Sequence, residues 1–142
     1  MNSQAGDTGA EPLPAFSGLT VGDGFGPVEY DVSAAANDRY WRAAGIEHAL
    51  RDAGLLYPPM AANLTILALQ TVSPAPLLHT RQRLTNHRGA MAPATVIVTG
   101  TVTDRFERRG REYLEVTAEF SIDGEALWTS IATFIPAGSE RP

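Results

Sequence analysis

Between residues 112 and 122, apolar and polar side chains alternate, and this is the clearest pattern in the chain. A period of two predicts a β-strand with one buried side and one side facing water. Further strands are predicted over residues 77–87, 94–106 and 126–135. The pair Asp123-Gly124 suits a tight hairpin turn before the last of them. The buried side of the 112–122 strand would consist of Leu114, Val116, Ala118, Phe120 and Ile122.

A short strand and two helical segments are predicted ahead of these strands. Residues 28–32 alternate between apolar and polar side chains and predict the strand. Ser33 can cap a helix over residues 34–44, which would end at Gly45. A second, shorter helical segment is predicted over residues 47–53, and it would end at the next glycine.

A third helix, over residues 60–69, is predicted to be the centre of the fold. The prolines at positions 58 and 59 suit its start. Apolar residues recur at spacings of three and four, and Ile66 and Leu69 add apolar side chains outside that stripe. We therefore expect this helix to be buried on most sides, and it is too short to cross a membrane. The stripe consists of Met60, Ala61, Leu64, Leu67 and Ala68.

This order of elements predicts an α+β domain. One apolar helix, preceded by a short strand and followed by an antiparallel meander, calls for a sheet curved around that helix. The hot-dog fold has this order. The rival is a cone-shaped α+β barrel, which would begin with long helices and have no leading strand. We place the domain at residues 15–137, between tails at residues 1–14 and 138–142.

Composition narrows the possible chemistry. The 142-residue chain has no cysteine, which excludes disulfides, cysteine-ligated zinc and thiol nucleophiles. It also has no lysine for a Schiff base, because all 11 basic residues are arginine. The three histidines lack a paired metal-ligand spacing, so we expect neither a metal nor a cofactor. With a net charge of −5 and no signal-peptide pattern, we expect a cytoplasmic protein that binds neither nucleic acid nor membranes.

Six short segments carry a family resemblance: Tyr30–Ser33, Tyr40–Gly45, Tyr57–Met60, Leu78-His79, Val98–Val102 and Arg109–Arg111. Together they resemble MaoC-like hot-dog hydratases and dehydratases, over roughly residues 16–135. The resemblance implies an acyl-CoA or acyl-carrier-protein substrate, held in a tunnel at a dimer interface, and addition or removal of water across a carbon–carbon double bond. The exposed edges of a single sheet also favour a homodimer, or a heterodimer with a related hot-dog chain.

The working loop of that family is altered in this chain. In the family, a loop similar to Gly-Asp-x-Asn-Pro-x-His follows the first helix, and its Asp and His position a water molecule. Here residues 45–50 read Gly-Ile-Glu-His-Ala-Leu, without the Asp or the Asn-Pro. Three interpretations stay open: Glu47 and His48 replace the missing pair, the chain catalyses another reaction such as thioester hydrolysis or cyclisation, or it is a non-catalytic acyl-binding or partner subunit.

Three residues are candidates for catalysis. Hydration of an enoyl thioester needs a base, an acid and a hydrogen-bond donor for the enolate oxygen. We expect His48 to be the base because imidazole titrates near neutral pH, with Glu47 beside it and Asp38 as a third candidate. The structural alternatives are a surface Glu-His pair that starts a short helix, and an i,i+4 ion pair between Asp38 and Arg42.

Tyr40, Tyr57, Asn63 and Arg81 are candidates for substrate binding. Tyr40 has packing as its alternative role, and Tyr57 can line the mouth of a pocket. Asn63 is a lone amide in an apolar helix and must find a partner in the protein or in a ligand. Arg81 belongs to a row on one strand side that suits a phosphate or faces water. The row consists of His79, Arg81, Arg83, Thr85 and His87, and a second cluster, Arg105, Arg108, Arg109 and Arg111, would be a solvated hairpin tip or a carrier-protein docking site.

Overall fold

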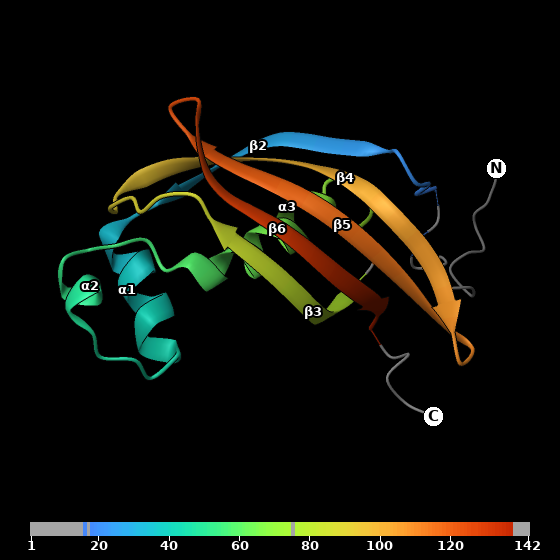
Figure 1. Cartoon of the computed structure of the whole chain (residues 1–142), viewed down its shortest axis with the longest axis horizontal. Coiled ribbons are helices and arrows are strands. Elements are labelled where there is room, and N and C mark those ends of the chain that lie inside the picture. The colour runs from blue at the N-terminus through green and yellow to red at the C-terminus, as the bar shows by residue number, and fades with distance from the viewer. Residues whose placement is uncertain (1–15, 17, 75, 138–142) are drawn as a thin grey trace, which may run out of the picture.

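Five antiparallel strands form a single sheet in the order β2-β4-β5-β6-β3 (Figure 1). The computed structural model describes residues 16, 18–74 and 76–137, so the predicted tails lie outside the described residues. Each long strand that the sequence predicts is present. The strands are β2 (Gly24–Val32), β3 (Leu77–Asn86), β4 (Ala94–Arg108), β5 (Arg111–Ile122) and β6 (Glu125–Pro136).

The first strand is longer than the sequence pattern predicts. β2 begins at Gly24, whereas the alternation of side chains begins only at Val28. Its pairing with β4 shifts register between Phe25 and Val28, where Gly26 and Pro27 interrupt the pattern. A glycine has no side chain that reveals which face it occupies, and an irregular pairing breaks the period of two. The alternation of side chains therefore could not predict the first half of this strand.

Three short helical elements and one 3-10 turn connect β2 to β3. Helix α1 (Ala34–Ala43) is capped as expected by Ser33, whose Oγ accepts a hydrogen bond from the Ala36 amide at 3.0 Å. Helix α2 (Ala49–Asp52) begins two positions later than expected, because His48 is its cap and not a helical residue. The prolines form the 3-10 turn η2 (Pro58–Met60), and the central helix α3 (Ala61–Leu69) follows.

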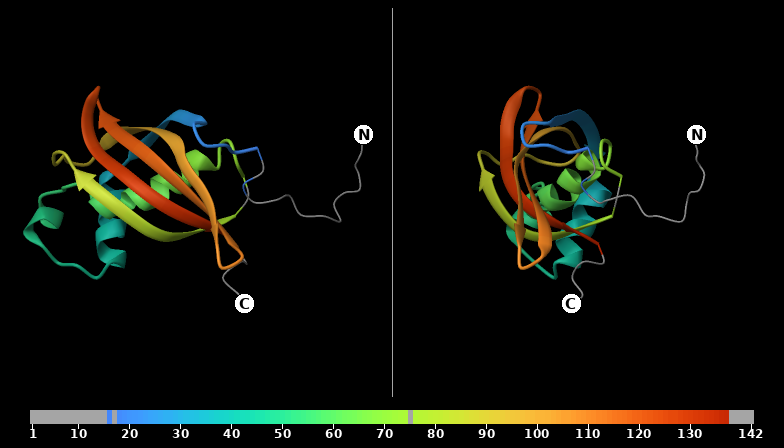
Figure 2. Two further views of the ribbon diagram at one scale, coloured as in Figure 1. Left: turned by 45° about the vertical axis from the view of Figure 1, so that its right-hand side comes forward. Right: turned by 90° about the vertical axis from the view of Figure 1, so that its right-hand side faces the viewer.

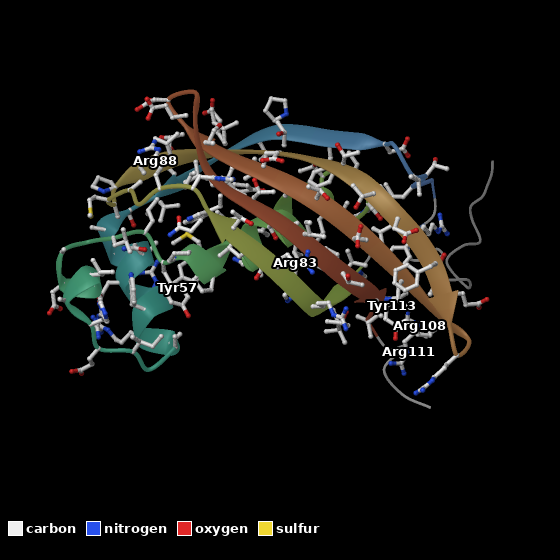
Figure 3. The ribbon with its side chains drawn as sticks, in the orientation of Figure 1. Tyr57, Arg83, Arg88, Arg108, Arg111 and Tyr113 are labelled. Carbon is white, nitrogen blue, oxygen red and sulfur yellow. The ribbon has the colours of Figure 1, made fainter. Side chains whose placement is uncertain are left out.

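Helix α3 lies in the hollow of the sheet. It contacts β2, β3, β4 and β6, and Figure 2 shows the sheet curving around it. The opposite, convex side of the sheet carries polar and charged side chains, many of them visible in Figure 3. The α+β class and the curved antiparallel sheet around a central helix are thus confirmed, and the cone-shaped barrel is excluded by the leading strand.

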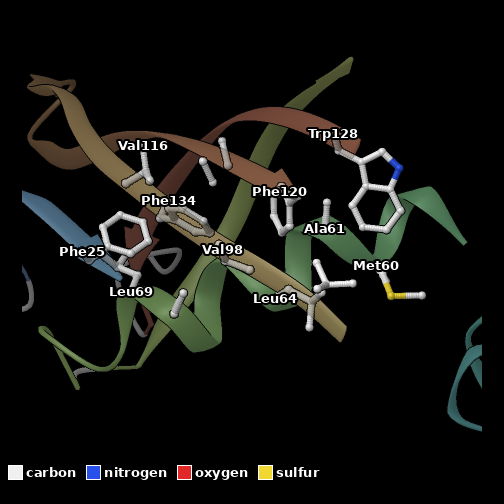
Figure 4. Close-up of a cluster of buried hydrophobic side chains, with 14 of the residues drawn as sticks. Phe25, Met60, Ala61, Leu64, Leu69, Val98, Val116, Phe120, Trp128 and Phe134 are labelled. Carbon is white, nitrogen blue, oxygen red and sulfur yellow. The ribbon is translucent and has the colours of Figure 1, made fainter. Parts of the chain in front are cut away.

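The core fills the space between α3 and the concave side of the sheet (Figure 4). Phe120 and Trp128 lie opposite each other on β5 and β6 with their ring centroids 5.5 Å apart. Gly100 on β4 leaves room for the ring of Phe25, which a Cβ atom at this position would overlap. The turn η2 contributes Met60 to this core, and α3 contributes Ala61, Leu64, Ala68 and Leu69.

One side of α3 is not buried, contrary to the expectation from its composition. Leu67 was placed in the buried stripe but is 41% exposed, and Asn63 one turn earlier is exposed as well. Thr65 is buried instead, because its hydroxyl donates to the Ala61 carbonyl at 2.7 Å and so needs no other partner. The helix therefore presents a strip with Asn63 and Leu67 on the side away from the sheet.

Candidate functional site

Helices α1 and α2 form an arm (residues 34–52) beyond one end of the sheet (Figure 1). Glu47 and His48 lie on the connection between these two helices. Both side chains are exposed. His48 caps α2, and its Nδ1 accepts a hydrogen bond from the Leu50 amide at 3.0 Å. A neutral imidazole that accepts at Nδ1 carries its proton on Nε2, so this His48 presents a donor to the surroundings.

Asp38 is held between two arginines of the arm. Its carboxylate accepts a hydrogen bond from Arg51 Nε at 3.0 Å and forms a second ion pair with Arg42. These bonds, with that from Arg51 the largest contribution, lower the pKa of Asp38 below its usual value. The ion pair with Arg42 that the spacing predicts is present, and Arg51 additionally joins α1 to α2. Asp38 therefore stays ionised, and both its oxygens already have donors.

Two buried side chains of α1, neither of them a candidate site residue, position the segment before η2. The Leu55 carbonyl accepts hydrogen bonds from Asn37 Nδ2 at 2.9 Å and from Trp41 Nε1 at 2.8 Å. The Tyr57 amide donates to Asn37 Oδ1 at 2.9 Å. A fixed segment of irregular backbone needs such partners, but nothing in the local pattern marks Asn37 as buried.

Tyr40, Tyr57 and Asn63 come together where α1 meets the start of α3, and we call these three residues the tyrosine–amide cluster. Asn63 Nδ2 donates a hydrogen bond to Tyr40 Oη at 2.8 Å. The rings of Tyr40 and Tyr57 stack with their centroids 6.5 Å apart, and Trp41 meets Tyr57 edge-on at 5.0 Å. Of the two partners expected for the Asn63 amide, one in the protein and one in a ligand, the structure shows the one in the protein. The cluster borders the exposed strip of α3.

Arg81, the fourth predicted binding residue, lies away from this cluster on the convex face of the sheet. The predicted row on β3 is also broken, because the pairing with β6 shifts between His79 and Arg81. His79 lies opposite Phe134 and contacts its ring at 5.5 Å on the concave side, whereas Arg83 stays on the same side as Arg81. Partial burial lowers the pKa of His79. The bulge between His79 and Arg81 places their side chains on opposite faces of the sheet, because one extra residue reverses the face that the following side chains occupy.

The predicted hairpin cluster of arginines also divides. Arg105 turns inward and donates to the carbonyls of Phe16 at 3.0 Å and Leu19 at 2.6 Å. It also pairs with Glu112 at 2.7 Å. Arg105 therefore fastens the start of the described chain to the sheet, and the remaining arginines of the hairpin stay at the surface.

The Tyr40 hydroxyl and the Asn63 amide are polar groups that the structure places at the exposed side of α3. Among residues 16, 18–74 and 76–137, no three acidic or histidine side chains gather as they would around a metal ion. Within the same part of the chain, no helix combines the length and the apolar composition needed to span a bilayer. The tyrosine–amide cluster can orient a polar group by hydrogen bonding, with the exposed Leu67 further along the same side of α3.

Several solved structures share this fold. The HadBC (3R-hydroxyacyl-ACP dehydratase) complex from Mycobacterium tuberculosis aligns with a TM-score of 0.68 at 16% identity, over 81% of this chain and 96% of that one. The (R)-hydratase from A. caviae involved in PHA biosynthesis aligns with a TM-score of 0.66 at 16% identity, over 83% and 97%. The MaoC-like dehydratase from Rhodospirillum rubrum aligns with a TM-score of 0.64 at 17% identity, over 87% and 97%.

No protein-family model matches the chain, and no curated protein sequence matches it either. At identities this low, the alignments show a shared fold, and the resemblance to MaoC-like hot-dog proteins is confirmed at that level. The three structures are described as hydratases or dehydratases.

Proposed function

We propose that this chain acts on an acyl thioester of coenzyme A or of a carrier protein, and that it adds or removes water between an enoyl and a 3-hydroxyacyl group. The shared fold carries this proposal, since hydratases and dehydratases align with more than 80% of the chain. The sheet wrapped around α3, with one side of the helix left open, offers a place for an acyl group beside that helix.

The tyrosine–amide cluster is the proposed seat of the thioester carbonyl. Because Asn63 Nδ2 donates to Tyr40 Oη, the Tyr40 hydroxyl proton is free to donate elsewhere. A hydroxyl aimed at the carbonyl oxygen stabilises the enolate, which forms when water oxygen attacks the 3-carbon in hydration or when the 2-carbon loses a proton in dehydration. Leu67, further along the same side of α3, would contact the apolar part of the substrate.

Glu47 is the proposed base and His48 the proposed donor. In hydration, the Glu47 carboxylate takes a proton from water, the resulting oxygen attacks the 3-carbon to give the enolate, and the protonated Glu47 returns that proton to the 2-carbon. The His48 Nε2–H donates a hydrogen bond that orients the water. The hydrogen bond from the Leu50 amide occupies His48 Nδ1, so a base at Nε2 would need the other tautomer and would lose this cap. This division of roles differs from the expectation that His48 is the base.

A second hot-dog chain is proposed to complete the site. Glu47 and His48 lie on an exposed arm, and the arm also exposes Ile46 and Leu50. Strand β3 is an edge of the sheet, paired with β6 on one side. Neighbouring structures include the HadBC complex and the ChsH1–ChsH2 complex, both from Mycobacterium tuberculosis. A partner that covers α3 and the arm would enclose these groups, as a homodimer or as a heterodimer.

The alternative function is a non-catalytic subunit of such a heterodimer. The altered loop and the two arginines that hold Asp38 favour it, because the loop lacks the Asp and Asn-Pro of the family and the Asp38 carboxylate is already paired. In that case the chain would bind acyl groups or stabilise a catalytic partner.

Turnover of defined thioesters by the purified chain tests the proposal. Enoyl-CoA and enoyl-carrier-protein substrates are incubated with the chain, and mass spectrometry identifies the products. We expect hydrated products, and we expect analytical ultracentrifugation to show a dimer. Glu47→Gln should reduce turnover by at least about tenfold, as typical for loss of a general base. Glu107→Gln, an exposed carboxylate at the far hairpin, is the matched control and should leave it unchanged.

Other results would redirect the interpretation. Free acid as the only product would indicate thioester hydrolysis instead of hydration. A well-folded chain that turns over no substrate alone, yet activates a co-expressed hot-dog chain, would identify the partner-subunit role. Sedimentation only as a monomer at micromolar concentration would contradict the proposed assembly.

A further inference from the structure

A groove of about 430 Å³ lies on the convex face of the sheet, opposite α3. Its floor includes Ile131 and Thr133 of β6. Arg81 and Arg83 of β3 stand on one side of this floor, because both are paired with those two residues across the sheet. Tyr113 of β5 stands on the other side, and the groove extends to β4 (Figure 3). Four neighbouring strands thus build a recess of the size that small ligands occupy.

The groove is strongly basic within an acidic protein. The chain has a net charge of −5, yet Arg81, Arg83 and Arg108 line the groove, and none of the three forms an ion pair with any residue in the described part of the chain. One carboxylate, Glu115, also lines it, and this group accepts a hydrogen bond from Thr103 Oγ1 at 2.7 Å. Local positive charge without internal partners favours an anionic ligand.

An aromatic surface lies beside these guanidinium groups. Phe106 on β4 and Tyr113 on β5 stack with an interplanar angle of 5° and a centroid distance of 5.0 Å. The Arg108 guanidinium lies 5.5 Å from the Phe106 centroid. Phe106 covers one face of the Tyr113 ring, and both rings line the groove. A planar group placed there would stack on a ring whose position is already held.

We propose that this groove binds a nucleotide, with the base stacked on Tyr113 and the phosphate oxygens held by Arg81, Arg83 and Arg108. Arginine forks match phosphate oxygens in pairs, and aromatic rings accept any base by stacking. A bare phosphate would leave the aromatic face unused. The site lies on the opposite side of the sheet from α3, so it goes beyond the proposed hydration site and does not depend on it.

Binding to the full chain can be measured by isothermal titration calorimetry with ADP, adenosine and inorganic phosphate. ADP should bind saturably. Adenosine and phosphate should each bind at least about tenfold more weakly, because adenosine lacks the phosphate groups for the arginines and phosphate lacks the base that stacks on Tyr113. Arg83→Ala should weaken ADP binding about tenfold or more, as expected for a charge-assisted hydrogen bond. Arg39→Ala, an exposed arginine on α1 without an ion pair in the described residues, is the matched control and should have no effect.

The aromatic contribution has its own pair of variants. Tyr113→Phe retains the ring and should bind ADP normally, whereas Tyr113→Leu should weaken binding about tenfold. Coenzyme A in place of ADP distinguishes the two sources of a nucleotide: tighter binding of coenzyme A would assign the groove to the nucleotide end of a thioester, and equal binding to a free nucleotide. Circular dichroism confirms that each variant is folded.

Several outcomes would overturn the proposal. These are the absence of saturable ADP and coenzyme A binding, equal losses in Arg83→Ala and Arg39→Ala, and equal affinity for ADP and inorganic phosphate. Loss of thioester hydration in Glu47→Gln would leave ADP binding intact, so failure of the proposed function and failure of this site are separable.

Discussion

Replacement of Asn37 by alanine should release the segment that carries Tyr57. The Asn37 side chain is 2% exposed and uses both ends of its amide. Its Nδ2 donates to the Leu55 carbonyl at 2.9 Å, and its Oδ1 accepts from the Tyr57 amide at 2.9 Å. After the change, the Leu55 carbonyl keeps the hydrogen bond from Trp41 Nε1, but the Tyr57 amide loses its acceptor.

The size of the effect follows from these two bonds. The bond to Leu55 contributes about 1 kcal/mol net, and a buried amide left without an acceptor costs about 1–3 kcal/mol, so we expect Asn37→Ala to lower the free energy of unfolding by about 2–4 kcal/mol. A loss of this size should lower the thermal midpoint by roughly 5–15 °C. Urea unfolding followed by tryptophan fluorescence measures the free energy, and calorimetry measures the midpoint.

Asn63→Ala is the matched control, because it removes the same side chain from an exposed position with one hydrogen bond, to Tyr40 Oη at 2.8 Å. We expect it to cost less than about 1 kcal/mol. If Asn37→Ala were no more destabilising than Asn63→Ala, then burial of the amide would not be what holds the segment before η2, and the reasoning would be wrong.

Two further predictions concern the sheet. Gly100→Ala should destabilise the protein by about 1–3 kcal/mol in urea unfolding, because its Cβ overlaps the Phe25 ring, and adding Phe25→Leu should recover part of that loss. Partial burial lowers the pKa of His79, so its contribution to stability is present above the unfolded-state pKa of about 6.5 and is lost as the pH falls through the folded-state value. His79→Gln should therefore lose less stability than the parent between pH 7 and pH 5, and an identical pH profile would contradict this.

The elements of the fold could be predicted where side chains alternate or recur locally. The period of two in residues 112–122 predicts β5 because an antiparallel strand with one buried face has that period. The hairpin at Asp123 and Gly124 is confirmed, and both residues have the positive φ, 52° and 79°, that such turns require. Ser33 begins α1 as its capping side chain indicates.

The side on which a residue lies depended on contacts between segments distant in the sequence. The bulge between His79 and Arg81 separates two side chains that the alternation places together, and it exists only in the pairing of β3 with β6. Likewise, Asn37 is buried because α1 docks on the segment before η2.

The sequence by itself determined the order and type of the elements, because turn chemistry, capping and periodicity act over a few residues. Only the tertiary structure decided which side chains share a site. It joined Tyr40 to Asn63, kept Glu47 and His48 on an exposed arm, and gathered Arg81 and Tyr113 from different strands. Strand neighbours and register are properties of the assembled sheet, so the groove on its convex face has no counterpart in any local pattern.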